Sequence, residues 1–434
     1  MLIILVKEIT PRIDYTMDLV FNEVMGIPYA ITEDAEEFRR SKSQKINYTK
    51  EKIPGCLSIP ATDLLYESEL AHQEIKTGQW KNLPTLFAHE KEEIPFDIFS
   101  AIFFLVSRYE EYLPFKSDTF NRFEADQSIA VKHNFLHIPV VDLWCQQLSK
   151  ELNINKFGKF LKSSNYKFTL TVDIDHAWVF KHKGILQNFA RLTRDLILFN
   201  FGEFRFKLNV LLNRIKDPGD SYKLLETIQN RLKQKIKFFI LSGGNHKFDF
   251  NIPVDHKKTV QLIKWLDSFS DVGLHPSISS NNSYKQLVRE NEDLSAVLGH
   301  SIHISRQHYL MLNLPETYRR LIRLGINEEH SMGYGSRTGF RAGIARPFYF
   351  YDLYEEKQTS LRVFPFQVMD RTLVSYLNYK PEEAIKEFKY YTDTISSVGG
   401  HFIALWHNTS LNETYEWRGW KKVFLEMIAM NEPK

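Results

Sequence analysis

The stretch TLTVDIDHAWVF, residues 169–180, decides how the second half of this chain is interpreted. A run of strand-forming residues leads directly to Asp173, Asp175 and His176. Burying such charged groups is costly unless a partner compensates for the lost hydration. A metal ion, a catalytic proton transfer or plain surface exposure would each provide that compensation, and the rest of the chain has to discriminate between them.

A regular alternation of strands and helices begins at this stretch. Strand-like segments occur at residues 167–175, 235–243, 271–277, 301–309, 325–334, 361–370 and 401–408. Helical segments lie between them, at residues 222–234, 256–269, 283–299, 315–325 and 381–399. Several of these helices open on Ser, Pro or acidic residues and close at Gly, as helix ends should. The alternation predicts a parallel sheet, and six or seven such units predict a (β/α) barrel.

The composition is that of an ordinary globular protein with more than one domain. A length of 434 residues exceeds one ordinary core, so we expect two domains. Hydrophobic residues make up 43% and charged residues 25%, which argues against disorder. The 56 Lys and Arg exceed the 53 Asp and Glu by only three, so no strong field favours a nucleic-acid partner.

Cysteine usage and apolar runs bear on localisation. Only Cys56 and Cys145 occur, which excludes a disulfide framework and favours a reducing compartment. The first residues lack the features of a secretory signal. The longest apolar run, residues 98–106, is too short to span a bilayer and predicts a buried helix. We therefore expect a soluble, cytoplasmic protein.

The chain divides into two expected domains. Residues 1–155 predict a smaller N-terminal α/β domain that carries no chemical motif, and residues 165–434 predict the barrel. The polar stretch at residues 153–167 is the expected linker. An amphipathic, basic and helical insertion is expected at about residues 181–216. This insertion could pack on its own domain, cap a site or make a peripheral contact with a membrane surface.

Polar side chains gather where the predicted strands end. Asp173 and Asp175 end the first strand of the barrel and, being two residues apart, share one face of it. His275, the pair Arg306 and His308, and His407 end later strands. In a parallel α/β barrel the active site forms at the carboxyl ends of the strands. These residues are therefore candidates for one site.

The same segments resemble motifs of a known family. TVDID, HPSIS at His275, RQHY and LWH resemble, in this order, motifs of the polysaccharide deacetylases of the NodB-homology family (carbohydrate esterase family 4). GFRAGIARPFYFYD is similar to an Arg-containing stretch of a subgroup that carries an extra N-terminal domain of unknown function, and residues 9–32 are similar to the start of that domain. The resemblance covers about residues 167–408, and it implies a distorted (β/α) barrel that uses a divalent metal ion.

The resemblance also implies roles for individual residues. Asp173 would be the catalytic base and Asp175 a metal ligand, although Ile174 separates two aspartates that are adjacent in the family, so the two roles could be exchanged. His275 would be a second ligand, Arg306 would hold the base, and His407 would be the general acid. The alternatives are an Asx turn or helix cap for the aspartates, an ordinary salt bridge for Arg306, and buried, hydrogen-bonded histidines.

One departure from the family concerns the metal. The expected second histidine, four residues after His275, is Ser279, and a neutral hydroxyl is a far poorer zinc ligand than imidazole. His176 and His308 are the nearest substitutes. We expect a divalent ion, zinc by resemblance, that is weakly bound through Asp175, His275 and waters.

Three further residues are candidates for substrate contact. Arg341 in the glycine-flanked GFRAG segment could bind a substrate carboxylate or sustain the base, and a structural role fits it equally. Trp406 and Tyr309 could stack on a sugar ring, with core packing as the alternative for each aromatic.

These observations leave three functional hypotheses. The first is a metal-dependent de-N-acetylase that acts on an N-acetylated glycan or glycan precursor. The second is a catalytically inactive barrel that serves as a carbohydrate-binding or assembly module. The third is another metal-dependent amide hydrolase on the same barrel.

Overall fold

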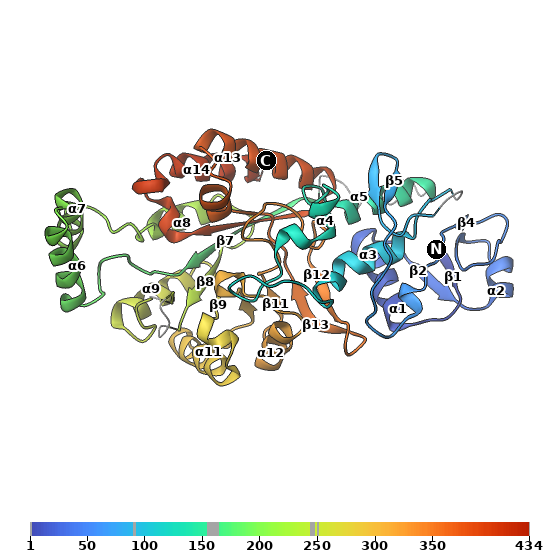
Figure 1. Cartoon of the computed structure of the whole chain (residues 1–434), viewed down its shortest axis with the longest axis horizontal. Helices are drawn as coiled ribbons and strands as arrows, with labels where there is room; N and C mark the ends of the chain where they lie inside the picture. The colour runs from blue at the N-terminus through green and yellow to red at the C-terminus, as the bar shows by residue number, and fades with distance from the viewer. Residues whose placement is uncertain (1, 90–92, 154–164, 244–247, 250, 434) are drawn as a thin grey trace.

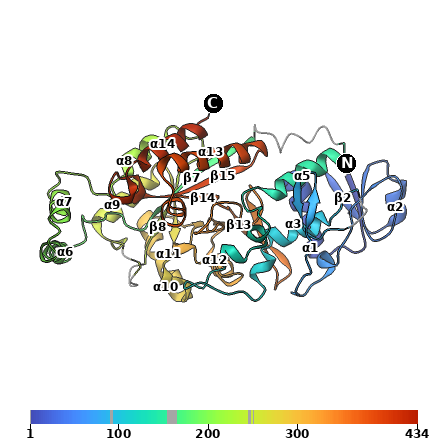
Figure 2. The same ribbon diagram turned by 45° about the horizontal axis from the view of Figure 1, so that its top comes forward.

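The structure is a computed structural model, and it describes residues 2–89, 93–153, 165–243, 248–249 and 251–433. The boundary expected at residue 155 and most of the expected linker lie at residues 154–164, outside the described residues, and the boundary expected at residue 165 is the first described residue after them. The molecule is elongated, with the N-terminal elements at one end and helices α6 (Ile185–Ile197) and α7 (Phe201–Leu211) at the other (Figures 1 and 2).

The N-terminal part folds around a small parallel sheet in the order β2-β1-β3-β4. These strands are β1 (Leu2–Val6), β2 (Tyr29–Thr32), β3 (Gln44–Tyr48) and β4 (Leu57–Ser58). The other elements are α1 (Pro11–Met17) with a π-helical continuation (Asp18–Val24), α2 (Ala35–Arg40), the hairpin β5 (Gly78–Trp80) and β6 (Leu83–Thr85), α3 (Ile98–Val106), α4 (Ile129–Lys132) and α5 (Val140–Glu151). Asp97 caps α3 by accepting a hydrogen bond from the Ser100 backbone N–H, and every residue of this helix is buried. The prediction of a buried helix at residues 98–106 is therefore confirmed.

The second part folds around a nine-stranded sheet in the order β12-β13-β11-β10-β9-β8-β7-β15-β14. Its strands are β7 (Lys167–Ile174), β8 (Lys237–Leu241), β9 (Asp271–His275), β10 (Ile304–Ser305), β11 (Glu328–Glu329), β12 (Phe348–Asp352), β13 (Lys357–Val363), β14 (Val368–Met369) and β15 (His401–His407). Every neighbouring pair is parallel except β12 with β13. All seven predicted strand segments contain at least one of these strands, so the predicted parallel sheet is confirmed.

The sheet is not a closed barrel, in contrast to the ring that the alternation predicted. The chain from β13 to β14 pairs with β11 at its start and with β15 at its end, so one interrupted segment contacts strands near both ends of the strand order. The interruption contains Pro365, which has no N–H to donate to a strand ladder. Across it, Phe366 N donates to Met332 O and Gly339 N donates to Gln367 O. Irregular backbone therefore replaces a continuous ladder here.

Helices cover the outside of this sheet (Figure 1). They are α8 (Tyr222–Gln229), α9 (Lys257–Asp267), α10 (Ile278–Asn281), α11 (Tyr284–Leu298), α12 (Glu316–Leu324), α13 (Pro381–Ser397) and α14 (Trp420–Asn431). The helix ends follow local signals: Ser283 accepts a hydrogen bond from Gln286 N at the start of α11, and Gly299 and Gly325 adopt left-handed conformations after α11 and α12. The five predicted helical segments correspond to α8, α9, α11, α12 and α13.

The N-terminal part and the large sheet share one hydrophobic core and several buried ion pairs. Arg12 binds Glu356 at 2.6 Å, and Asp142 binds Arg346 at 2.7 Å. Arg341 is 2% exposed and forms a two-pronged pair with Glu111, at 2.9 and 2.6 Å. The expectation that Arg341 binds substrate is therefore replaced by a structural role at this junction, because both carboxylate oxygens of Glu111 already bind its guanidinium.

Candidate active site

The register of the large sheet brings the polar strand ends together. His407 of β15 lies opposite Asp173 of β7, and the ladder continues through β8 to His275, the last residue of β9. Arg306 follows β10 directly, and its backbone N–H donates to Leu274 O of β9. Since all these strands run parallel, their carboxyl ends meet at one edge, as the sequence predicted.

A group of metal-competent donors lies at this edge. Ligand atoms of Asp175, His275 and His308 all lie within 4.8 Å of one another. Asp175 Oδ1 is 3.2 Å from His275 Nε2 and 3.8 Å from His308 Nε2. This oxygen is buried and has no hydrogen-bond partner among the described residues. One carboxylate and two imidazoles form a donor set that suits a divalent metal ion, and the unpartnered oxygen is free to be one of the donors.

Both histidines are oriented by their second ring nitrogen. His275 Nδ1 contacts Arg306 O at 2.5 Å, and His308 Nδ1 contacts Asp249 Oδ1 at 2.7 Å. Asp249 is fully buried and also accepts a hydrogen bond from the Ile278 backbone N–H. Such outer partners fix the ring and leave Nε2 free to bind a metal. Both Nε2 atoms therefore face Asp175.

The donor group contains His308, one of the two substitutes that the sequence offered, in addition to the two expected ligands. Ser279 lies in α10, while the donor group contains His308, which follows β10, and does not contain His176. The His176 backbone carbonyl instead accepts a hydrogen bond from Asn408. Because His308 follows a neighbouring strand rather than His275 itself, the usual sequence spacing does not reveal it.

The charges of the site determine its protonation. Burial opposes ionisation of Asp175, but His308, His275 and His407 outweigh it and hold the pKa of this carboxyl well below its usual value. Burial lowers the pKa of His275, and the nearby Asp173 and Asp175 reverse this and raise it. The carboxylate is therefore ionised at neutral pH, as metal binding requires.

Asp173 lies beside the donor group in a pair with Arg306. Arg306 Nη1 donates to Asp173 Oδ1 at 2.8 Å, and Asp173 Oδ2 is 3.7 Å from His275 Nε2. The arginine is fully buried, its Nε donates to His330 O at 2.9 Å, and its guanidinium lies 4.6 Å from the ring centre of Phe239. A packed arginine of this kind holds the carboxylate in one orientation.

His407 lies on the other side of Asp175 and is paired with Asp370. His407 Nδ1 is 2.8 Å from Asp370 Oδ1, and its Nε2 is 3.7 Å from Asp175 Oδ2. Burial lowers the pKa of His407, but the contact with Asp370 outweighs burial and raises it to about 9. The imidazole therefore holds a proton at neutral pH, with Nε2 directed into the site.

Sequence reasoning missed Asp249 and Asp370. Asp370 follows β14, so the strand-end argument that selected His407 also applies to it. Asp249 lies in the connection after β8, between residues outside the described part of the chain, and no local pattern indicates it.

Two aromatic candidates have different surroundings. Trp406 is fully buried, stacks on Phe388 at 5.7 Å between ring centres, and donates from its indole N–H to the Met427 sulfur. It points away from the site because it alternates with His407 along β15, so the expectation of substrate contact is replaced by core packing. Tyr309 is half-exposed and lies 4.5 Å from His308 between ring centres.

Tyr309 also meets the N-terminal part of the chain. Its ring stacks on Phe120 at 4.8 Å, and its backbone carbonyl accepts a hydrogen bond from Arg122 at 2.5 Å. Phe248 packs on the same tyrosine at 5.7 Å. An aromatic surface built from three distant segments therefore borders the donor group.

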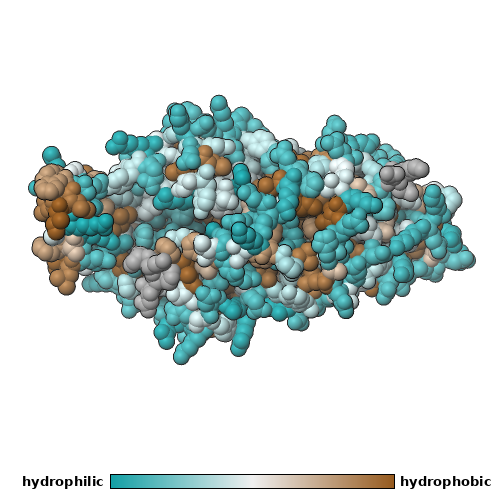
Figure 3. Space-filling model, viewed as in Figure 1, coloured by the Kyte–Doolittle hydropathy of each residue, from teal (hydrophilic) through white to brown (hydrophobic). Residues whose placement is uncertain are grey.

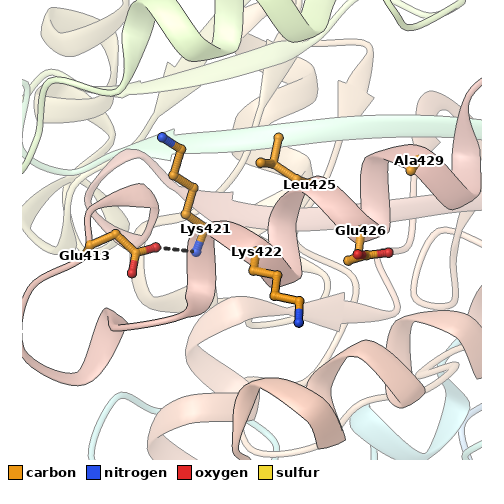
Figure 4. A pocket seen from close by; sticks show the side chains of 6 residues that line it. All are labelled: Glu413, Lys421, Lys422, Leu425, Glu426 and Ala429. Atoms are coloured by element: carbon orange, nitrogen blue, oxygen red, sulfur yellow. Dashed lines mark hydrogen bonds between the residues drawn. The ribbon is translucent and has the colours of Figure 1, made fainter.

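A hollow on the outer side of α14 lacks such convergence (Figure 4). It is lined by Glu413, Lys421, Lys422, Leu425, Glu426 and Ala429. These residues come from α14 and the loop before it, and Lys421 N donates to Glu413 at 3.3 Å. Its charged residues are two of each sign, so this hollow indicates no particular ligand.

Comparison with known families gives a match that covers the N-terminal part only. Residues 2–156 match the family described as "Family of unknown function (DUF7033)". No curated protein matches the chain.

Solved structures similar to the chain have low identity. The structure of a "putative polysaccharide deacetylase from Mycobacterium smegmatis" is 13% identical, with a TM-score of 0.39 over 62% of this chain and 85% of that one. The polysaccharide deacetylase Bc1974 from Bacillus cereus is 11% identical, with a TM-score of 0.30 over 61% and 85%. A mutant of a CE4 family pseudoenzyme with restored activity is 14% identical, with a TM-score of 0.25 over 60% and 62%.

Proposed function

We propose that this protein is a metal-dependent de-N-acetylase that acts on an N-acetylated glycan or glycan precursor. One observation carries the proposal: the donor group of Asp175, His275 and His308 lies between a carboxylate held by arginine and a protonated histidine. Amide hydrolysis needs a base for the attacking water and an acid for the departing amine. Asp173 and His407 supply these two groups at one strand edge.

The donor group would hold a divalent cation, with zinc as the best match to one carboxylate and two imidazoles. When bound, such an ion lowers the pKa of water and polarises a carbonyl oxygen. Three protein donors leave a position open, and they favour tighter binding than the two-ligand site expected from Ser279. Asp249 and the Arg306 carbonyl hold the two imidazoles in place for this task.

The remaining residues of the site transfer protons or contact the substrate. Asp173 accepts the proton of the attacking water, and Arg306 fixes its orientation. His407 donates its Nε2 proton to the departing amine, while Asp370 holds Nδ1 and stabilises the charged ring. The aromatic surface around Tyr309 offers the apolar face on which a pyranose ring packs, and this supports a glycan as the substrate.

The test is acetate release from N-acetylated oligosaccharides by the purified full chain. Activity should disappear on chelation and return on addition of zinc, and Asp173→Asn should retain the metal but release no acetate. Retained metal without acetate release by the unaltered protein would point to an inactive binding module. Hydrolysis of other amides in place of glycans would keep the chemistry and reject the substrate.

A further inference from the structure

The insertion between β7 and β8 exposes far more apolar surface than the rest of the molecule. Seventeen large apolar side chains are exposed among the described residues, and ten belong to the α6–α7 hairpin, defined here as residues 181–216. Ile185 is 89% exposed, Leu186 86% and Phe199 78%. The others are Phe189, Leu196, Ile197, Leu198, Phe201, Leu212 and Ile215. Figure 3 shows them as a hydrophobic surface at the end of the molecule that carries α6 and α7.

The hairpin departs from the usual arrangement of a water-exposed helix pair, in which apolar side chains are buried and charged side chains are exposed. Its two helices are joined by an ion pair, in which Lys207 Nζ lies 2.9 and 2.7 Å from the carboxylate oxygens of Asp195. Asp195 is the buried residue of α6, while Leu186, Phe189 and Ile197 on the same helix are exposed. A charged pair therefore lies between the helices, while several large apolar side chains face outward. A contiguous apolar surface of this kind marks an interaction site.

Basic residues accompany the apolar surface. Residues 181–216 contain eight Lys and Arg but only two Asp and Glu, a surplus of six where the whole chain has a surplus of three. Both acidic residues are engaged: Asp195 with Lys207, and Glu203 with the Tyr415 hydroxyl at 2.6 Å. Arg194, Arg205, Arg214 and Lys216 are exposed. The uncompensated charge of the hairpin is therefore positive.

We propose that the α6–α7 hairpin docks on the surface of an anionic lipid bilayer. Exposed apolar side chains flanked by basic residues are the features with which interfacial helices insert below the headgroups and attract anionic lipid. Like charges on two hairpins would repel a second copy of the chain. The exposed apolar residues also continue around the turn between the helices, through Leu198, Phe199 and Phe201, and such a projecting tip suits a deformable lipid phase better than a flat protein surface.

The docked hairpin lies in the interface and does not cross the membrane. The helices contain 13 and 11 residues, so each is shorter than the hydrocarbon thickness of roughly 30 Å. No helix within the described ranges is long and apolar enough to cross a membrane.

The base of the hairpin is fixed to the catalytic end of the sheet. Asp217 accepts hydrogen bonds from the backbone N–H groups of Val179, Phe180 and Lys181, at 2.7, 2.9 and 2.9 Å. Asn188 of α6 donates to Phe180 O at 3.0 Å. Membrane docking would therefore hold the carboxyl end of β7 close to the bilayer, whatever chemistry occurs there.

Vesicle flotation of the full chain tests this proposal. The protein should float with vesicles of phosphatidylcholine and phosphatidylglycerol, and much less with phosphatidylcholine alone. Leu186→Gln, Phe189→Gln and Ile197→Gln together should abolish flotation. Arg194→Gln with Arg205→Gln should weaken partitioning by roughly fivefold per charge. Ile9→Gln, Tyr354→Gln and Tyr390→Gln together form the matched control, since these exposed residues lie outside the hairpin, and should change nothing.

Two further measurements distinguish membrane binding from effects on folding and on oligomeric state. Phe199→Trp should show blue-shifted tryptophan emission on adding anionic vesicles, which requires insertion of the tip and no loss of folding. The oligomeric state of the unaltered chain should stay the same in the triple hairpin variant. The proposal is overturned if the unaltered protein ignores both vesicle types, if the hairpin variants float like the control, or if the triple variant only dissociates an oligomer.

Discussion

Each of the two larger sheets of this protein has beside it an aspartate with a buried carboxylate oxygen, and the surroundings of the two aspartates are opposite in kind. Asp97, next to the N-terminal sheet, accepts hydrogen bonds from the Tyr48 hydroxyl, from Thr62 N and Oγ1 and from Ser100 N. Asp175, at the edge of the large sheet, has an oxygen without any such partner and three histidines around it. Burial raises the pKa of Asp97, whereas cationic neighbours overcome burial and lower the pKa of Asp175.

This difference separates a carboxylate with a structural role from the one that we propose as a metal ligand. Neutral donors complete the shell of Asp97, so nothing remains for it to bind. Asp175 instead lies among three histidines, and its Oδ1 accepts no hydrogen bond from the described residues, so it remains able to bind a cation. Four predictions test this contrast.

The largest effect is expected from Asp175→Asn. The variant should lose its divalent ion and all metal-dependent activity, because the one carboxylate of the donor group is gone. Asp173→Asn should lose turnover but keep most of the metal, as measured by elemental analysis of purified protein. The opposite metal contents would show that the two aspartates exchange roles.

Removal of the proposed proton donor, His407, should lower activity less than removal of the proposed metal ligand Asp175. His407→Ala should retain the metal and lower the rate by about 10²–10⁴-fold on an amide, with a smaller loss on an ester, whose alkoxide leaves more easily than an amine. Equal losses on both substrates would contradict the general-acid role.

Asp370, the partner of His407, should determine how activity depends on pH. Asp370 is the cause that raises the pKa of His407, and a general acid works only while protonated, so activity falls as pH rises through this pKa. Asp370→Asn should move the alkaline limb of kcat/KM to lower pH. An unchanged profile with a reduced rate would mean that Asp370 only positions the ring.

The smallest effects on activity are expected outside the ligands. Asp249→Asn should weaken metal binding by about 10–100-fold, the usual value of an outer partner, with Ser279→Ala as the matched control that changes nothing. Asp97→Asn should destabilise the fold by about 1–3 kcal/mol and leave metal affinity unchanged. Metal titration measures the affinity, and denaturant unfolding measures the stability. A loss of metal from Asp97→Asn would contradict the contrast between Asp97 and Asp175.

Much of the fold was predictable because its signals are local. The periodicity of apolar residues and the capping residues of the helices depend on neighbours a few positions away, and the strands and helices appear where these signals lie. The place where the sheet is interrupted was not predicted, because the segment at residues 361–370 was interpreted as one strand. Pro365 instead lies between a part that pairs with β11 and a part that pairs with β15.

The sequence by itself determined that Asp173, His275 and His407 end strands of one parallel sheet, because strand direction alone brings such residues to one edge. Only the tertiary structure decided that His308 joins Asp175 and His275 as the third donor, and that Asp249 and Asp370 orient two of the histidines. It also decided that Arg341 serves the junction with Glu111 and that Trp406 lies in the core. These outcomes depend on distances between residues far apart in the chain and on which side of a strand each side chain lies, and no local pattern encodes either.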